Sequence, residues 1–283
     1  MLQPGIYYLE DAIKVQFDNT VIFGMGLATL VPYNGTACIE VGNFEGVRIS
    51  GVLLEASTAG SQHLLRFGEP GFEGNPQNPG LLADVFARAG RFYPTSTQYV
   101  SADVFVEVNA KHTIIDDVWL WRGDHDYYGL VYYGRNPVQH GLVVNAEDVH
   151  GYGLAVEHTV ADLLVWNANN GHAYFFQSEL PYDVSQETWG DLGYVGYRVA
   201  QNVTSHEAFG VGVYQFFRDF NVTVKSGIAA PDTPGVTFEN SLCVHLSGLG
   251  EITHVINDQG DACKDGVLTN YYCEYPPTNE FLQ

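Results

Sequence analysis

Short stretches of alternating hydrophobic and polar residues recur along the chain, and turns that often contain Asn or Gly interrupt them. Each repeat begins with two apolar residues separated by one residue, and a second and a third alternating stretch follow. No segment keeps a helical period of about 3.6 over 11 or more residues, so the pattern predicts short strands throughout. The repeats lie at 13–30, 39–56, 106–123, 142–159, 164–181 and 197–214.

Three short strands per repeat are typical of one coil of a parallel β-helix, in which a coil buries its apolar face only by stacking on the next. The shortest offset between repeats, from Leu142 to Leu164, is 22 residues, close to one coil without insertions. Longer offsets indicate inserted loops, and the clearest is the Gly- and Pro-rich segment 68–98. We therefore predict an all-β protein, with a single parallel β-helix domain over residues 1–283 and long inserted loops. A β-sandwich or a β-barrel is the competing all-β fold.

Two glutamates occupy the same position in neighbouring repeats. When Val144 is aligned with Trp166, the thirteenth residues that follow are Glu157 and Glu179. Equivalent positions on successive coils lie about 4.8 Å apart, so the two carboxyl groups are expected to stack on one face. Like charges at that distance cannot both ionise without cost, so one pKa is expected to rise. A glycosidase needs such a proton donor beside a second carboxylate. We therefore predict Glu179 as the general acid and Glu157 as the group that tunes it and orients water or substrate.

Polar and aromatic residues gather near the ends of the same strands. This favours a functional site there over the alternative that both glutamates are simply exposed to solvent on the surface. The segment 119–126 reads WLWRGDHD, and the segment 205–210 of the next coil reads SHEAFG. Pro181 ends a strand, so a turn is as compatible with the two residues after it as a substrate contact. The candidate substrate-binding residues are Trp121, Arg122, Asp124, His125, His158, Gln177, Tyr182, Asp183, His206 and Glu207.

Other polar clusters receive a structural interpretation. Asn109, Asn145 and Asn167 share one turn position and are predicted to form an asparagine ladder that satisfies turn backbone groups. Asp124 and His125 resemble metal ligands, but adjacent residues of a strand point to opposite faces. The four cysteines follow no zinc-binding spacing. We therefore predict neither a metal site nor a cofactor.

The charge balance limits the classes of molecule that the protein is expected to bind. Asp and Glu outnumber Lys and Arg 33 to 12, a formal net charge of −21. Such a surface repels nucleic acid, anionic membranes and polyanionic substrates. With 18 Tyr, 16 Phe and 4 Trp offering flat faces, a neutral polysaccharide or oligosaccharide is the expected partner. No apolar run is long enough to span a membrane and no signal peptide is visible. Three glycosylation sequons, at 34–36, 202–204 and 221–223, nevertheless suit an extracellular protein.

Five stretches carry a resemblance to a known family: TVIFGMGLATLVP, DDVWLWRGDHD, GYGLAVEHT, FFQSELPYD and SHEAFGVGVY. They resemble the GH55-like β-helix proteins, relatives of the fungal and bacterial β-1,3-glucanases in the pectate-lyase-like superfamily. The resemblance implies a right-handed parallel β-helix and inverting hydrolysis of β-1,3-glucan, with a glutamate general acid beside a second functional glutamate. It also implies two β-helices side by side, of which this chain matches the second. Either an N-terminal β-helix is missing from these residues, or this is a single-helix relative with a different substrate or none.

Three functional hypotheses follow. The first is a secreted glycoside hydrolase that cleaves a neutral β-glucan, with Glu179 as general acid. The second is a non-catalytic carbohydrate-binding or structural β-helix module. The third is a polysaccharide lyase with Arg122 as its base, which we rank last because the strong negative charge opposes an anionic substrate.

Overall fold

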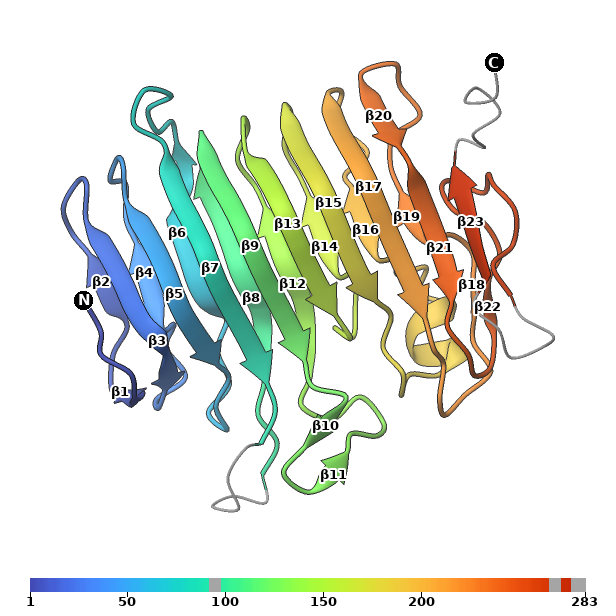
Figure 1. Cartoon of the computed structure of the whole chain (residues 1–283), viewed down its shortest axis with the longest axis horizontal. Helices are drawn as coiled ribbons and strands as arrows, with labels where there is room; N and C mark the ends of the chain where they lie inside the picture. Colours follow the sequence, from blue (N-terminus) through green and yellow to red (C-terminus); the bar gives the residue numbers. More distant parts are fainter. Residues whose placement is uncertain (92–97, 265–270, 276–283) are drawn as a thin grey trace.

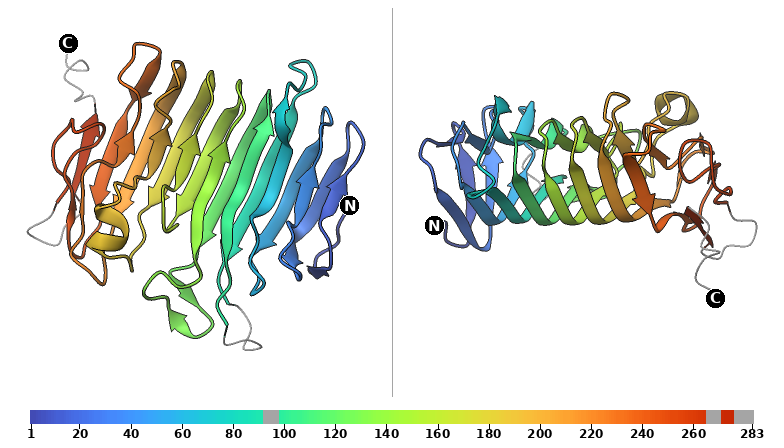
Figure 2. Two further views of the ribbon diagram at one scale, coloured as in Figure 1. Left: turned by 180° about the vertical axis from the view of Figure 1, so that it is seen from behind. Right: turned by 90° about the horizontal axis from the view of Figure 1, so that it is seen from above.

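Two long parallel sheets run along the molecule, and turns join them into one solenoid (Figure 1). The structure is a computed structural model that describes residues 1–91 and 98–264, together with the backbone of residues 271–275. The views from behind and from above show the coils following one another along a single axis (Figure 2). This arrangement confirms the predicted all-β parallel β-helix.

The larger sheet contains eleven strands within the described residues, in the order β1-β3-β5-β7-β9-β13-β15-β17-β21-β23, and β20 lies beside β17. All neighbours are parallel except β21 and β23. The strands are β1 (Ile6–Leu9), β3 (Val21–Pro32), β5 (Arg48–Glu55), β7 (Gly80–Ala89), β9 (Thr113–Arg122), β13 (His150–Glu157), β15 (Gly171–Glu179), β17 (His206–Gln215), β20 (Val236–Glu239), β21 (Ser241–His245) and β23 (Tyr271–Tyr275).

The second sheet has eight parallel strands in the described part of the chain, in the order β19-β16-β14-β12-β8-β6-β4-β2. They are β2 (Ile13–Val15), β4 (Ile39–Val41), β6 (His63–Phe72), β8 (Ala102–Ala110), β12 (Val138–Val144), β14 (Leu164–Trp166), β16 (Tyr197–Val199) and β19 (Ile228–Ala229). Four strands form two small pairs: β10 (His125–Asp126) with β11 (Gly129–Leu130), and β18 (Thr223–Val224) with β22 (Glu251–Ile252).

The π-helix η1 (Gln186–Gly190) buries Trp189 in the core after β15, and the side chain of Ser185 caps its first turn. No helix in the described ranges combines the length and the apolar character that a membrane crossing requires.

The observed register confirms the repeats predicted from the sequence. Leu142 pairs with Leu164, and Leu164 pairs with Tyr197, so the coil between the first two is 22 residues long. The sequence pattern did not identify two further repeats. Leu65 and Ile228 occupy the same position in these two coils.

The segment 68–98 is not a single inserted loop, so that prediction is wrong. Strand β6 extends into its start, and β7 occupies its middle and pairs with both β5 and β9. Leu82, Val85 and Ala87 of β7 are buried in the core. The alternation of apolar residues in LLADVFARA is therefore a better predictor of the structure here than the Gly and Pro residues that precede it.

The structure also has two main sheets where three strands per coil were expected. The second and third predicted strands are joined into one long strand of the larger sheet, which bends at a single residue with positive φ. At this position glycine costs nothing, whereas most other residues are strained. We call these residues the bend row: Leu27, Gly51, Asp84, Asp117, Gly153, Phe175, Gly210 and Asn240, with φ from 50° to 71°.

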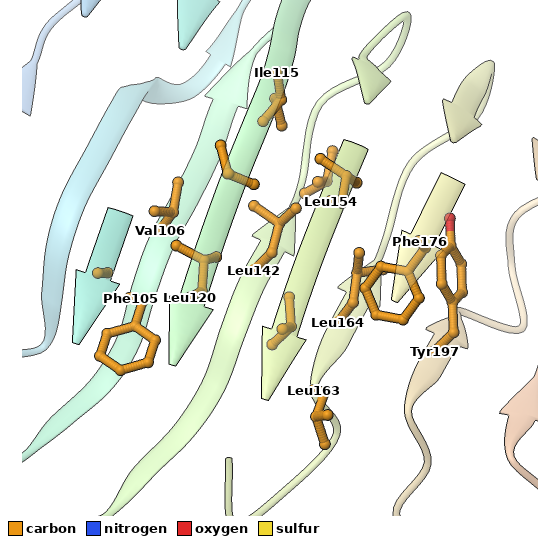
Figure 3. Close-up of a cluster of buried hydrophobic side chains, with 14 of the residues drawn as sticks. Phe105, Val106, Ile115, Leu120, Leu142, Leu154, Leu163, Leu164, Phe176 and Tyr197 are labelled. Atoms are coloured by element: carbon orange, nitrogen blue, oxygen red, sulfur yellow. The ribbon is translucent and has the colours of Figure 1, made fainter. Parts of the chain in front are cut away.

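One continuous apolar core fills the space between the sheets. Figure 3 shows the part of it where Leu142, Leu154, Leu164 and Phe176 meet, and all four are at most 1% exposed. Burial of one such side chain stabilises the fold by roughly 1.5–3 kcal/mol. Since each strand alternates, the residues between these core positions point outward and form continuous rows along the outer surface.

The predicted asparagine ladder is present at a turn of the solenoid. Asn145 Nδ2 donates to Asn109 Oδ1 at 2.9 Å, and Asn167 Nδ2 donates to Asn145 Oδ1 at 2.8 Å. Asn109 Nδ2 in turn donates to the Gly68 carbonyl at 3.2 Å. The ladder therefore ties four successive coils together.

Asn145→Ala should lower the free energy of unfolding by about 1–3 kcal/mol, because it removes both hydrogen bonds at the centre of the ladder. Urea denaturation monitored by circular dichroism measures the change. Asn202→Ala, at an exposed turn asparagine, is the matched control. An equal loss in both variants would contradict the stabilising role of the ladder.

Candidate functional site

The ends of β9, β13, β15 and β17 place an outward-facing row of side chains next to one another. The row consists of Trp121, Glu157, Glu179 and Tyr214. Glu157 and Glu179 are direct partners in the parallel register of β13 and β15, so the predicted stacking of these residues is confirmed. Their backbones are therefore about 4.8 Å apart. We call these two residues the glutamate pair.

The glutamate pair retains a proton to near-neutral pH. Burial, followed by the negative charge of Glu179, raises the pKa of Glu157 from 4.5 to about 7. The charge of Asp124 acts in the same direction, whereas hydrogen bonds with Trp119 and Gln177 act in the opposite one. Two carboxyl groups so close together lose their protons in steps that belong to the pair, so the pair as a whole can donate one proton.

The side chain of Glu179 has two polar neighbours. The hydroxyl of Tyr182 donates a hydrogen bond to Glu179 Oε2, and His158 Nε2 lies 3.9 Å from the same oxygen. Burial lowers the pKa of His158 to about 4, so its ring is neutral at pH 7. His158 Nδ1 lies 3.2 Å from the Leu180 carbonyl, which accepts a hydrogen bond from it, so the proton of the neutral ring is on Nδ1 and Nε2 carries none. The ring therefore adds no positive charge beside Glu179.

Aromatic rings line one side of the glutamate pair. The rings of Trp119 and Trp121 stack with their centroids 5.4 Å apart, and the ring of His125 lies 5.4 Å from that of Trp121. Asp124 Oδ1 is 3.1 Å from His125 Nδ1 and fixes the orientation of that ring. Trp119 is 42% exposed, so a flat apolar face is open to solvent next to the carboxyl groups.

The hairpin of β10 and β11 extends this aromatic side beyond the ends of the long strands (Figure 1). Its tyrosines were not predicted as site residues, although the run DYYGLVYYG at 126–134 was a visible signal. Tyr127, Tyr128 and Tyr133 are each at least half exposed. The Arg135 guanidinium lies between the rings of Tyr99 and Tyr133, at 5.1 and 6.0 Å.

Arg122 and Asp183 do not face this site, which corrects their prediction as substrate-binding residues. The Arg122 guanidinium is 1% exposed and donates to both carboxylate oxygens of Asp183, at 3.0 and 2.8 Å. Burial tends to raise the pKa of Asp183, but the hydrogen bonds and charge of Arg122 hold it below its ordinary value. Arg122 also donates to the carbonyls of Arg135 and His158, so the ion pair holds the turns beneath the site. A guanidinium so enclosed cannot serve as the base of a lyase.

His206 and Glu207 also lie outside the site. His206 points into the core, where its Nε2 is 2.8 Å from the Tyr197 hydroxyl and burial lowers its pKa to about 3. Glu207 points outward, but it lies at the opposite end of β17 beside His172, at 3.3 Å. Both lie at the start of their strand, whereas the glutamate pair lies at the ends of its strands.

The structure brings the remaining candidates together around the glutamate pair, and their contact with substrate stays a prediction. They are Trp121, Asp124, His125, His158, Gln177 and Tyr182. Within residues 1–91 and 98–264, no group of three or more His, Cys, Asp or Glu side chains is arranged to hold a metal ion. The expectation of a metal-free site likewise stays a prediction.

Comparisons with known proteins identify a matching family and a relative of similar sequence. A family model described as the LAM55 pectate lyase-like domain matches residues 1–179. An exo-beta-1,3-glucanase of Streptomyces sp. (strain SirexAA-E / ActE) is 37% identical over 267 residues, which cover 92% of this chain and 43% of the relative.

Two solved structures are similar in fold as well as in sequence. That of sacteLam55A from Streptomyces sp. SirexAA-E has a TM-score of 0.88 at 35% identity, covering 95% of this chain and 49% of that chain. A variant of sacteLam55A in complex with glucose has a TM-score of 0.85 at 34% identity, covering 95% and 48%. The chain thus spans a little less than half the length of these relatives.

Glu157→Gln should remove a pH dependence of stability. A carboxyl group whose pKa is raised on folding stabilises the protein fully below its unfolded pKa of 4.5, and this contribution is lost as the pH rises through about 7. Between pH 5 and pH 8 the free energy of unfolding of the unmodified chain should therefore fall by roughly 1–3 kcal/mol more than that of the variant. Urea unfolding at both pH values tests this, with Glu239→Gln at an exposed position as control. A difference that does not change with pH would contradict the shifted pKa.

Arg122→Met should lower the free energy of unfolding by about 3–5 kcal/mol, because it leaves the buried Asp183 carboxylate without its cation. The double variant Arg122→Met/Asp183→Leu should be more stable than this single variant, since no buried charge then remains unpaired. Thermal and urea unfolding of the two variants measure the difference. A double variant that is less stable than the single variant would show that the pair does not act as described.

Proposed function

This chain belongs to the LAM55 pectate lyase-like domain family, and from that membership we propose that it hydrolyses a neutral β-glucan, most specifically a β-1,3-glucan. The observation that carries the proposal is the glutamate pair, which keeps a proton near neutral pH at the surface of the solenoid. A relative 37% identical is an exo-beta-1,3-glucanase, and a structural relative was solved with glucose bound. Both facts support a glucan as the substrate class.

The proposed mechanism uses one proton that the pair exchanges with substrate and water. Glu179 donates the proton to the leaving glycosidic oxygen while Glu157 is ionised. A water molecule attacks the anomeric carbon from the opposite face of the sugar ring and releases a proton to solvent, and the pair takes up a proton from solvent, so the pair again holds one proton and water has been added across the broken bond. This end state matches the free chain, in which the raised pKa belongs to Glu157. Because water rather than a carboxylate is the nucleophile, the anomeric configuration inverts.

The surroundings of the pair fit a neutral sugar. The Trp119 and Trp121 rings offer flat faces, while Gln177 and Asp124 offer hydrogen-bonding groups. No Lys or Arg within the described ranges forms an ion pair with Glu157 or Glu179, so the site lacks the cation that a uronate carboxylate would need. Secretion is part of the same proposal, since a polymeric glucan is met outside the cell.

The relatives are about twice as long as this chain, which covers 43% and 49% of them. We extend the proposal to a second β-helix beside this one, as in the two-helix GH55-like proteins. Such a β-helix would contribute groups that hold the attacking water, while the glutamate pair of this chain handles the proton.

Glu179→Gln should reduce the hydrolysis of laminarin, a soluble β-1,3-glucan, at least about a hundredfold, because an amide cannot protonate the leaving oxygen. A reducing-end assay measures turnover. The melting temperature should change by only about 2 °C, since Glu179 is on the surface and gains little from its charge. Glu239→Gln, at an exposed position, should retain full activity.

Three results would point elsewhere. Full activity of Glu179→Gln would remove this residue as general acid. Laminarin binding without turnover by the unmodified chain would favour a carbohydrate-binding module. Unsaturated products detected by ultraviolet absorbance would favour a lyase.

A further inference from the structure

Phe175 is the only aromatic residue of the bend row, and the only bulky one apart from Leu27, which lies in the irregular stretch of β3. The Phe175 φ of 65° is left-handed, a conformation that a bulky residue adopts only with strain. The residues aligned with it on the two neighbouring coils are Gly153 and Gly210, for which the same conformation costs little. A bulky residue held in this conformation between two glycines of the neighbouring coils indicates that its side chain serves a purpose other than folding.

The Phe175 ring does not help to form the core. The side chain is 64% exposed, and within residues 1–91 and 98–264 its ring makes no stacking contact with another ring. The space next to it is open, because a β-carbon added to Gly210 would meet only the Phe175 Cα, at 3.9 Å. The ring therefore stands on the outer surface with free space over the neighbouring coil.

Phe175 lies on the same strand as Glu179 of the glutamate pair. Glu179 is four positions further along β15, about 13 Å at about 3.3 Å per residue. Gln177, which hydrogen-bonds with Glu157, points outward between them. On the other side of the bend, the rings of Tyr174 and Phe209 stack 5.4 Å apart. An extended ligand that binds at the pair can follow β15 past Gln177 and reach the Phe175 ring.

The chemistry of this path fits a neutral sugar chain. An exposed ring beside open space offers an apolar face for the C–H face of a sugar, while Gln177 offers hydrogen bonds to hydroxyl groups. Continuity with the glutamate pair favours a glucan over a protein partner, because one polymer occupies both places at once.

We propose that Phe175 is a stacking platform for sugar residues remote from the cleaved bond, and that it makes the site selective for longer glucan chains. The proposal rests on the proposed function only for the identity of the ligand. A short oligosaccharide bound at the pair does not reach the ring, whereas a longer one does. The strained backbone is retained because it holds the ring outward.

The test compares Glu179→Gln with Glu179→Gln/Phe175→Asn, since both bind without turnover and asparagine tolerates the left-handed conformation. Isothermal titration calorimetry with laminarihexaose should show about three- to tenfold weaker binding for the double variant. Binding of laminaribiose should be the same in both. The melting temperature of the double variant should be equal or about 1–3 °C higher, because the strain is relieved. Tyr33→Asn in the same background, at a ring 67% exposed far from the site, should alter neither affinity.

Each outcome separates the two proposals. Equal hexaose affinity with and without the ring overturns the role of Phe175, whatever the activity of the unmodified chain. Weaker binding of both oligosaccharides also overturns it, because a general disturbance of the site would then be the cause. A change in sedimentation coefficient with unchanged hexaose affinity assigns the ring to a protein interface instead. Chain-length-dependent loss of affinity in a chain that hydrolyses no glucan supports Phe175 and contradicts only the proposed function.

Discussion

Parallel stacking of coils in a fixed register is the constraint on which this structure depends. Because β13 and β15 pair residue by residue, every outward side chain has a neighbour at the same position of the next coil. Tyr152 stacks on Tyr174 with ring centroids 5.1 Å apart, which is favourable. The same rule places Glu157 beside Glu179, which is unfavourable. One geometric repeat thus stabilises the fold at most positions and concentrates an electrostatic cost at one.

Asp183 and Glu157 show two ways in which an acidic group meets the cost of its charge. Asp183 remains ionised because the guanidinium of Arg122 donates two hydrogen bonds to it. Glu157 has no cation within the described part of the chain and takes up a proton instead, which its pKa of about 7 expresses. An ion pair of the first kind is chemically inert and fixes turns. A protonated carboxyl group of the second kind can transfer its proton.

The bend row shows how the same repeat tolerates exceptions. Glycine and aspartate accept the left-handed conformation at this corner with little strain, so most coils turn there without a special contact. The bend also explains why two sheets are observed rather than three, since hydrogen bonding continues through it. Phe175 adopts the conformation at a greater cost, and the surrounding coils supply the stability that permits it.

The amino-acid sequence by itself determined the repeat, the β-helix and the stacking of Glu157 on Glu179, and its resemblance to GH55-like proteins is confirmed. These features follow from periodicity. The alternation of apolar and polar residues, together with the offset between repeats, predicts which residues share a row. Alternation also indicates that Arg122, next to the outward-facing Trp121, points inward.

Only the tertiary structure decided what surrounds each of these groups. The partner of Arg122 is 61 residues away, in a loop whose path no local pattern describes. The pKa of Glu157 is raised by burial and by the charges of Glu179 on β15 and of Asp124 in the loop after β9. A periodic pattern specifies neighbours along and between strands, whereas burial and electrostatic potential are sums over residues that the chain brings together only when it folds.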